Sequence, residues 1–340
     1  MWKSVADCAP ARPTALGGLR RRDCVAALAA GACWPSTAPA AALDEALNKL
    51  PERCGLPSHS VGLYARVVGQ AQPLVAINAE QPFQMASTAK LVTSMAALDV
   101  LGPEFRWRTA AYLDGELRDG TLWGDLWLVA RLAVAQAWAR VGGRLTGAVV
   151  EQAVGPRAPQ LFAVHQSERL PALLREINKT SDNLAARHLM LAMSPGFPKQ
   201  AATLPAAQRR MQQWLAQQGL ARGDIEVDSG SGLSRQERAK PRALAALLER
   251  FAYHPQGMAL LSSLPLAGVD GTMQHRLRGG AAQGQAYLKT GTLMDTRALA
   301  GYIKTRSGHV VVVTALINHP QADRATGQMD GCIEWLARYA

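Results

Sequence analysis

The chain has 340 residues, of which 48% are hydrophobic and 19% are charged, and its net charge is +11. This composition predicts a globular protein with a substantial core and excludes a disordered or fibrous chain. No apolar run reaches the roughly 18 residues that a membrane-spanning helix needs. The basic residues are scattered and lack the aromatic and arginine-rich clusters of a nucleic-acid platform, so the charge favours a polyanionic cell envelope as the surroundings.

Residues 1–42 have the pattern of an export signal. Three arginines at positions 20–22 precede an alanine-rich apolar run from Cys24 to Ala32, and small residues follow from Ser36 to Ala42. This order of basic, apolar and small residues is typical of a secretory leader, and the Arg-Arg-Asp start is compatible with the twin-arginine route. We therefore expect a periplasmic or envelope-exposed protein; the alternative is a disordered alanine-rich tail.

The five cysteines divide at the end of this leader. Cys8, Cys24 and Cys33 would leave with it, which keeps Cys54 and Cys332 in the remaining chain. These two can form a single disulfide in an oxidising compartment or remain as free buried thiols. No Cys-x-x-Cys pair indicates a zinc or redox site.

Hydrophobic periodicity predicts a helix at the start of the chain's folded part, followed by two hairpins with a helix between them. The second hairpin has Asp119-Gly120, a dipeptide that favours a tight turn, between its strands. In chain order, these elements are a helix at 43–50, strands at 60–68 and 74–77, a helix from Ser87 to Leu101, and strands at 107–113 and 122–129.

The hydrophobic pattern in the second half of the chain predicts helices first and strands last. Residues 130–160 show no firm period, and we assign no function to them. Short connections make the last three strands antiparallel neighbours, so the chain as a whole is mixed α/β. The elements are helices at 170–177, 184–193, 206–219 and 241–253, a polar break at 178–183, strands at 287–292, 299–304 and 310–317, and a helix at 329–339.

Ser87 and Lys90 form a Ser-x-x-Lys pattern at the start of a predicted helix. Residues i and i+3 of a helix are neighbours on one face, so a hydroxyl and an amine would lie side by side as a possible nucleophile and base. The pattern occurs by chance about once in a chain of this size, and by itself it carries little weight.

Two further tripeptides follow Ser87 and Lys90 in the chain. Ser181-Asp182-Asn183 fits Ser-x-Asn, and Lys289-Thr290-Gly291 opens the first C-terminal strand. The three patterns together, in this order and in these contexts, are much rarer than any one alone. Each also has a structural alternative, because Ser181 and Asn183 can cap a helix that begins at Leu184, and Lys289 can be a solvated charge on an edge strand. No His-Glu-x-x-His or Gly-x-Ser-x-Gly motif supports metal or Ser-His-Asp hydrolysis.

These segments resemble the penicillin-recognising serine enzymes, and within them the D-alanyl-D-alanine carboxypeptidase/endopeptidase family of class C low-molecular-mass penicillin-binding proteins. The resemblance implies a penicillin-binding/β-lactamase-like transpeptidase fold, in which an antiparallel sheet packs with helices beside a mostly helical subdomain. It implies a peptidase domain at 43–128 and 160–340. Because family members usually carry one or two extra domains between the first two motifs, 129–159 would be a shortened remnant of that insertion. The matching segments are 86–93, 177–184, 228–234, 267–272 and 288–293.

The resemblance assigns the acylation chemistry to the first two motifs. Ser87 would be the nucleophile and Lys90 its base, Ser181 would relay the proton to the leaving amine, and Asn183 would bind the substrate amide and orient Lys90. Lys90 acts as a base only when neutral, so its pKa must fall from about 10.4 to about 7 or 8. We expect burial and the nearby cation Lys289 to cause that fall.

The third motif would hold the substrate. Lys289 and Thr290 suit a terminal carboxylate, and Gly291 lets a substrate backbone lie against the strand. The resemblance places the oxyanion hole at the main-chain N–H groups of Ser87 and Thr292. We expect Asp228, Ser231 and Asp270-Gly271 to frame the cleft as turn and hydrogen-bonding elements rather than to react.

The sequence therefore predicts a serine peptidase that cleaves D-Ala-D-Ala ends or D-Ala crosslinks in peptidoglycan stem peptides and that β-lactam antibiotics acylate, with no cofactor, no metal and no nucleic-acid partner. One alternative is an inactive wall-binding or regulatory protein disabled by loss of the insertion. The other is a β-lactamase, although the chain has no Glu-x-x-Leu-Asn segment that would supply a deacylating glutamate.

Overall fold

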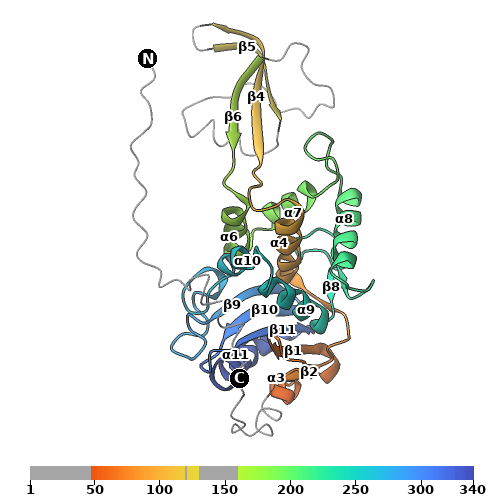
Figure 1. Ribbon diagram of the computed structural model, residues 1–340, viewed down its shortest axis with the longest axis vertical. Coiled ribbons are helices and arrows are strands. Elements are labelled where there is room, and N and C mark those ends of the chain that lie inside the picture. Colours follow the sequence, from red (N-terminus) through yellow and green to blue (C-terminus); the bar gives the residue numbers. More distant parts are fainter. Residues whose placement is uncertain (1–46, 119–120, 130–159) are drawn as a thin grey trace.

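The computed structural model describes residues 47–118, 121–129 and 160–340 (Figure 1). The predicted leader, the predicted turn at Asp119-Gly120 and the segment 130–159 lie outside the described residues. Of the helix predicted at 43–50, only the last four residues are described, and helix α3 covers Leu50–Cys54. Pro51 lies in its first turn, where a missing N–H group costs nothing, and Gly55 ends it with a φ of 62°.

A five-stranded antiparallel sheet forms the centre of the molecule, as the sequence predicts. Its order is β2-β1-β11-β10-β9, so the first hairpin and the three C-terminal strands share one sheet. Strand β1 pairs with β11 from near the other end of the sequence, with Val61 opposite Ile317. The strands are β1 (Val61–Val67), β2 (Val75–Ile77), β9 (Ala286–Leu293), β10 (Thr296–Lys304) and β11 (Val310–Asn318).

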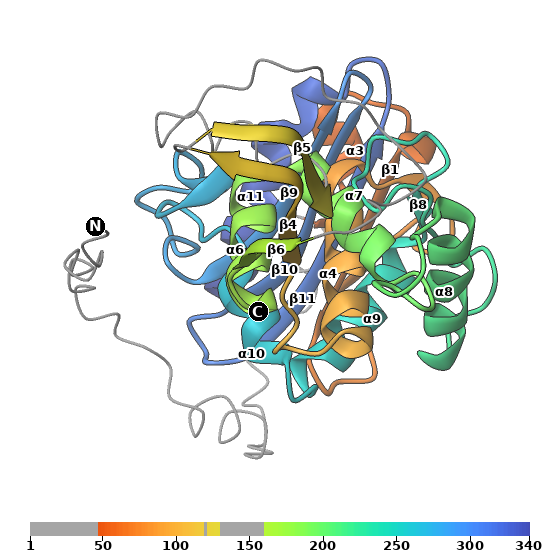
Figure 2. The same cartoon turned by 90° about the horizontal axis from the view of Figure 1, so that it is seen from above.

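Helices cover both faces of this sheet (Figures 1 and 2). Helices α3 and α11 (Thr326–Tyr339) pack on one face. The other face carries α4 (Ala89–Val100) and α9 (Pro241–Ala252), which share a second core with the remaining helices. Because both faces are buried, the central strands are apolar at consecutive positions, as in Val310–Val313. The remaining helices are α6 (Leu170–Thr180), α7 (Asn183–Ala192), α8 (Leu204–Gln217) and α10 (Gly257–Ser263), the last of which was not predicted.

These layers confirm the predicted fold class, a mixed α/β structure with an antiparallel sheet and a mostly helical part. None of the helices in the described ranges is both long enough and apolar enough to cross a membrane.

The polar break predicted at 178–183 is shorter in the structure. Helix α6 continues to Thr180, and Asn178 is fully buried within it. The amide of Asn178 donates hydrogen bonds to the hydroxyls of Ser94 (3.1 Å) on α4 and Ser263 (2.9 Å) on α10, so two other helices supply its partners. A buried amide with satisfied donors is compatible with a helix interior, which sequence polarity alone does not indicate.

Only Ser181 and Asp182 separate α6 from α7. Ser181 ends α6 in the left-handed region with a φ of 61°. Asp182 is the N-cap of α7, because its carboxylate accepts the N–H of Ala185 at 3.0 Å. The capping role considered for Ser181 and Asn183 therefore belongs to the residue between them.

A separate three-stranded sheet, in the order β5-β4-β6, extends from the body between α4 and α6 (Figure 1). The pairing of β4 (Arg108–Arg118) with β5 (Thr121–Val129) agrees with the predicted second hairpin. Strand β6 (Gln160–Gln166) was not predicted, and every residue of it is exposed. A third small sheet joins β3 (Phe83–Gln84), β8 (Arg238–Ala239) and β7 (Ile225–Glu226), and it brings the segment before β8 next to the turn that carries Ser87.

Candidate active site

Ser87 lies in a 3₁₀ turn, Ala86–Thr88, that leads directly into α4. Ala86 has a φ of 44°, in the left-handed region that residues with a Cβ rarely occupy. Gly232 packs against this turn so closely that a Cβ at position 232 would lie 1.9 Å from the Ala86 carbonyl oxygen. The nucleophile candidate is therefore held in a strained turn by tight packing, as is common at functional sites.

Lys90 is fully buried, and its Nζ has three oxygen partners. It lies 3.0 Å from Ser87 Oγ, 2.6 Å from Asn183 Oδ1 and 2.5 Å from the main-chain oxygen of Ser231. The two carbonyl-type oxygens can only accept hydrogen bonds. When the amine is neutral they occupy its two N–H groups, which leaves the lone pair for the hydroxyl of Ser87.

Burial lowers the pKa of Lys90 from 10.5 to about 8, because the charged amine loses its hydration. The negative charges of Glu237 and Asp182 act in the opposite direction and raise it. The balance places the neutral form within reach of physiological pH, which is what a lysine base requires.

Lys289 is also fully buried, so it is not the solvated edge-strand charge considered as the alternative. Its Nζ donates to Ser181 Oγ at 3.0 Å and to the main-chain oxygen of Thr290 at 2.9 Å. Burial, followed by the charge of Lys90, lowers the pKa of Lys289 from 10.5 to about 7. We expected burial and Lys289 to lower the pKa of Lys90; burial is the leading cause at both lysines, and repulsion between the two amines adds to it at Lys289.

Strand β9 lies at one end of the central sheet and borders the Ser87 turn. A Cβ at Gly291 would lie 2.8 Å from the Met85 carbonyl oxygen and 3.0 Å from the Ala86 Cβ. Glycine at this position is therefore needed for the packing of β9 on the turn, in addition to any approach by a substrate. The hydroxyl of Thr290 bonds that of Thr272 at 2.7 Å, and Thr292 is exposed.

The structure brings all the predicted site residues into one region, where α4, the α6–α7 junction and β9 meet. It also adds groups that the motifs did not indicate: the Ser231 carbonyl, the buried Glu237 and the Thr272 hydroxyl. The only sequence signal for Ser231 was its place in the glycine- and serine-rich segment 228–234. Nothing in the sequence distinguished Glu237 from an ordinary surface acid.

The segments expected to frame the cleft are held by hydrogen bonds to neighbouring elements. Asp270 accepts from Lys179 Nζ at 2.5 Å and from the N–H of Leu266 at 2.9 Å, just before Thr272. Asp228 accepts from the Gln208 amide at 2.5 Å.

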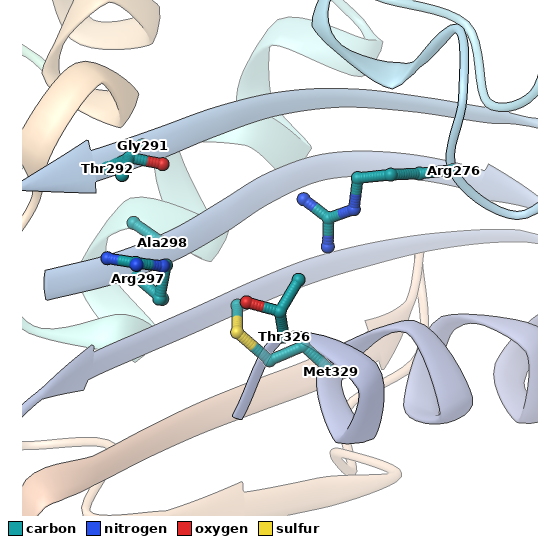
Figure 3. A pocket seen from close by; sticks show the side chains of 7 residues that line it. All are labelled: Arg276, Gly291, Thr292, Arg297, Ala298, Thr326 and Met329. Carbon is teal, nitrogen blue, oxygen red and sulfur yellow. The ribbon is translucent and has the colours of Figure 1, made fainter. Parts of the chain in front are cut away.

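A cavity of about 90 Å³ lies on the α11 side of β9 and β10. Figure 3 shows the side chains of Arg276, Arg297, Thr326 and Met329 around it. Arg276 is already paired with Asp330, at 2.6 Å. Gly291 and Thr292 of the candidate site also line this space, whereas Ser87 and Lys90 do not.

Two curated proteins are similar to about half of this chain. The sequence is 33% identical over 167 residues to D-alanyl-D-alanine carboxypeptidase DacB of Haemophilus influenzae, covering 48% of this chain and 34% of the relative. It is 30% identical over 188 residues to the D-alanyl-D-alanine carboxypeptidase of Actinomadura sp. strain R39, covering 53% and 34%. The chain thus spans about a third of the length of these curated relatives.

Solved structures show the same fold at low sequence identity. Penicillin binding protein 4 (dacB) from H. influenzae, complexed with a β-lactam, superposes with a TM-score of 0.71 at 19% identity, over 86% of this chain and 99% of that one. A penicillin G-acylated predatory endopeptidase from Bdellovibrio bacteriovorus gives 0.56 at 17% identity, over 82% and 92%. The TLA-1 β-lactamase gives 0.56 at 12%, over 87% and 99%.

The profile of the D-Ala-D-Ala carboxypeptidase 3 (S13) family matches residues 40–132 and 129–339, which is nearly all of the sequence beyond the predicted leader. With the motifs in their expected order and the fold of penicillin-binding proteins around them, the chain belongs to the D-Ala-D-Ala carboxypeptidase 3 (S13) family of serine peptidases.

Proposed function

We propose that this chain is a serine-type D,D-carboxypeptidase/endopeptidase that acts on peptidoglycan stem peptides through an acyl-enzyme on Ser87. The observation that carries the proposal is the position of the buried Lys90 Nζ, 3.0 Å from Ser87 Oγ, with a pKa lowered to about 8. A base must lie within hydrogen-bond reach of its nucleophile and titrate near the working pH, and Lys90 meets both conditions.

Acylation begins when Lys90 takes the proton of Ser87 and the serine oxygen attacks the carbonyl carbon of the penultimate D-Ala. The main-chain N–H groups of Ser87 and Thr292 stabilise the negative charge on the carbonyl oxygen. Two such donors contribute several kcal/mol to the transition state. Ser181 passes the proton to the leaving amine, the terminal D-Ala departs, and water then hydrolyses the Ser87 ester.

Strand β9 and Asn183 bind the substrate. The ammonium of Lys289 and the hydroxyl of Thr290 meet the terminal carboxylate, and Asn183 holds the substrate amide while its Oδ1 fixes Lys90. Gly291 keeps the strand against the Ser87 turn. Charge pairing of a buried ammonium with a carboxylate favours substrates with a free terminal carboxyl group.

The same proposal covers location and domain organisation. We infer export through residues 1–42 to the periplasm or cell envelope, where stem peptides and β-lactams are encountered. The peptidase domain comprises 43–128 and 160–340, and 129–159 is the remnant of the family's insertion. The strands of the β4–β5–β6 sheet flank this remnant in the chain, β4 and β5 before it and β6 after it.

Labelling with a fluorescent penicillin tests the proposal. The wild-type protein should form a stable covalent adduct, and Ser87→Ala should form none. Ser262→Ala, which removes an exposed hydroxyl on α10, should label like wild type. If labelling is absent, or persists in Ser87→Ala, the proposed nucleophile is wrong.

The family fold also includes β-lactamases, which makes the lifetime of this adduct informative. We expect the penicilloyl group to remain bound for much longer than one turnover of peptide hydrolysis takes. We also expect the protein to release D-Ala from a stem peptide that ends in D-Ala-D-Ala. Rapid loss of the adduct without D-Ala release would indicate a β-lactamase. A folded wild-type protein that neither labels nor releases D-Ala would favour the inactive wall-binding alternative.

A further inference from the structure

Glu237 is a fully buried carboxylate beside the candidate site. Its Oε1 accepts the main-chain N–H groups of Ser229 at 3.0 Å and Gly230 at 2.6 Å. Its Oε2 accepts the N–H of Gly232 at 2.7 Å, and weaker contacts come from the Ser229 hydroxyl (3.2 Å) and the Ser234 N–H (3.4 Å). These donors are all neutral, so the carboxylate is satisfied by the backbone of one short segment rather than by an ion pair.

The segment 229–234 is shaped around this carboxylate. A buried carboxylate without donors costs several kcal/mol, and successive main-chain N–H groups that converge on one anion offset that cost. The convergence requires Gly230 and Gly232 to adopt φ values of 76° and 88°, which residues with a Cβ rarely adopt. Glu237 and the conformation of 229–234 therefore depend on each other.

The same segment contacts the reacting groups directly. The main-chain oxygen of Ser231 accepts from Lys90 Nζ at 2.5 Å, and Gly232 packs on the main chain of Ala86 and Ser87. The main-chain oxygen of Glu237 also accepts the N–H of Met85 at 3.2 Å, just before the turn of the nucleophile. Glu237 thus contacts neither reacting atom but is joined to both through one layer of backbone.

The direction of the Lys90 lone pair depends on this arrangement. A neutral amine has two N–H groups and one lone pair, and the oxygens of Asn183 and Ser231 take the two N–H groups. If the Ser231 carbonyl moves, the amine can rotate and direct an N–H group at the Ser87 hydroxyl instead. Such a displacement of about 1 Å can cost on the order of a hundredfold in rate.

We propose that Glu237 is the positioning residue of the lysine base: its buried carboxylate holds the backbone of 229–234 so that the Ser231 carbonyl directs the Lys90 lone pair at Ser87. The inference rests on the proposed function in taking Lys90 as the base. It adds an acidic residue, outside the three motifs, on which the reactivity of the pair depends.

The charge of Glu237 provides a second, measurable link. Three charged groups face Lys90: Glu237 from the segment before β8, Asp182 from the α6–α7 junction and Lys289 from β9. Glu237 and Asp182 raise the pKa of Lys90, whereas its burial lowers it. Removal of the charge at position 237 should therefore lower the pKa of Lys90 further. If Glu237 acted only through its shape, its replacement by a neutral residue of the same shape would not shift this pKa.

The test compares Glu237→Gln with wild type in the full chain. Glutamine keeps the shape but removes the charge and turns an NH₂ donor toward main-chain N–H groups. We expect the rate of acylation by penicillin to fall roughly tenfold to a hundredfold, since misplacement of a catalytic group costs up to about that much. We also expect the titration of Lys90, followed by NMR of ¹³Cε-labelled lysine and assigned with Lys90→Met, to move to lower pH.

Glu334→Gln is the matched control. Glu334, on α11, likewise accepts main-chain N–H groups, from Ala281 at 2.7 Å and Ala282 at 3.3 Å, but on the opposite face of the sheet. It should alter neither the acylation rate of the folded protein nor the titration of Lys90. A folded Glu237→Gln protein with the wild-type acylation rate and the wild-type Lys90 titration would overturn the proposal.

Glu237→Asp covers the case in which the glutamine variant does not fold. It keeps the charge but withdraws the carboxylate from 229–234, so the acylation rate should fall while the Lys90 titration moves less than on loss of the charge. An aspartate variant with the wild-type rate would contradict the positioning role. The NMR titration requires no turnover, so it tests the link between Glu237 and Lys90 even if the wild-type protein proves inactive and the proposed function fails.

Discussion

Lys289 Nζ lies 3.0 Å from Ser181 Oγ, although the two residues are 108 positions apart in the chain. This contact joins the β9 strand to the α6–α7 junction and completes a site with two buried amines. Because the charge of one amine opposes that of the other, we expect the two amines to titrate as a coupled pair, with pKa values lowered to about 7 and about 8.

The pH dependence of acylation should follow this pair. In the proposed mechanism the active form has Lys90 neutral as base and Lys289 charged for the carboxylate, so it carries one proton over the two amines. The one-proton state is most populated between the two titration steps, and the active form is the part of that state in which the proton lies on Lys289 and not on Lys90. The kcat/KM for a D-Ala-D-Ala peptide should therefore be bell-shaped with a maximum between about pH 7 and 8. Initial rates from pH 5 to 10 measure it; a rate that still rises at pH 10 would be incompatible with this pair.

Replacement of Lys289 by methionine should stabilise the fold while it abolishes activity. In the unfolded chain a lysine stays protonated up to its ordinary pKa of 10.5, whereas buried Lys289 loses its proton near pH 7. The folded state binds fewer protons between these values, so the free energy of unfolding of wild type rises with pH across that window. Below pH 7 the cost of burying the charge is fully present.

Lys289→Met removes that cost, so the stabilisation should be larger at pH 6 than at pH 9. Replacement of buried ion pairs by apolar residues is often neutral or stabilising by about 1–4 kcal/mol, and we expect a gain within that range here. Urea unfolding at both pH values measures it, with exposed Lys199→Met as the control that should change the free energy by less than about 0.5 kcal/mol. A loss of stability at pH 6 would contradict this account of Lys289.

Gly232→Ala should disable the site, and Gly308→Ala should not. Both glycines have a φ of 88°, so alanine introduces the same backbone strain, about 1–2 kcal/mol, at each position. A Cβ at Gly308 meets nothing within 4 Å, whereas one at Gly232 would lie 1.9 Å from the Ala86 oxygen and 2.7 Å from the Ser87 nitrogen. Penicillin labelling per folded molecule should fall sharply only in Gly232→Ala; equal labelling of the two variants would show that this packing is not needed.

Asp270→Asn should weaken substrate binding more than catalysis. Asp270 anchors the segment whose Thr272 hydroxyl bonds Thr290, the proposed carboxylate ligand. We expect KM for a D-Ala-D-Ala peptide to rise roughly tenfold, which corresponds to the loss of about 1.4 kcal/mol of binding free energy, with a smaller change in kcat.

Asp224→Asn supplies the matched comparison. Asp224 also accepts one lysine, Lys240 at 2.8 Å, and one main-chain N–H, from Ala221 at 2.9 Å, but it lies next to β7 and β8. It should lose a similar amount of stability with no change in KM. If both variants raise KM equally, the effect is one of general loosening and not of the Thr272 segment.

Cys54 and Cys332 should react slowly with alkylating reagents in the native protein. Both thiols are free and buried, and burial raises the pKa of Cys54 to about 11 and that of Cys332 to about 12. Because the thiolate is the reactive form, little modification is expected at pH 8 until the protein unfolds. Mass spectrometry of iodoacetamide-treated protein, native and in denaturant, measures both sites; rapid native modification would contradict the burial of these thiols.

The sequence by itself determined the features that neighbours along the chain encode. The apolar runs at 299–304 and 310–317 and their short connections indicated antiparallel strands, and the helical spacing after Ser87 indicated α4. The order of the three motifs indicated the family. Which of the motif residues react remains a prediction, since neither the fold nor the relatives test their roles one by one.

Only the tertiary structure decided how buried and how connected these residues are. Lys289 is a charged residue on an edge strand, so its sequence context suggested exposure to solvent. It is nevertheless fully buried and bonded to Ser181, 108 positions away in the chain. Asn178 was predicted to lie in a polar break between two helices, but hydroxyls on two other helices accept hydrogen bonds from its amide inside α6. No sequence pattern marked Glu237 as part of the site, because its proposed role depends on main-chain N–H groups, which every residue but proline has. Burial and backbone contacts between distant segments arise only on folding, and they set the pKa values and the orientation of the Ser87–Lys90 pair.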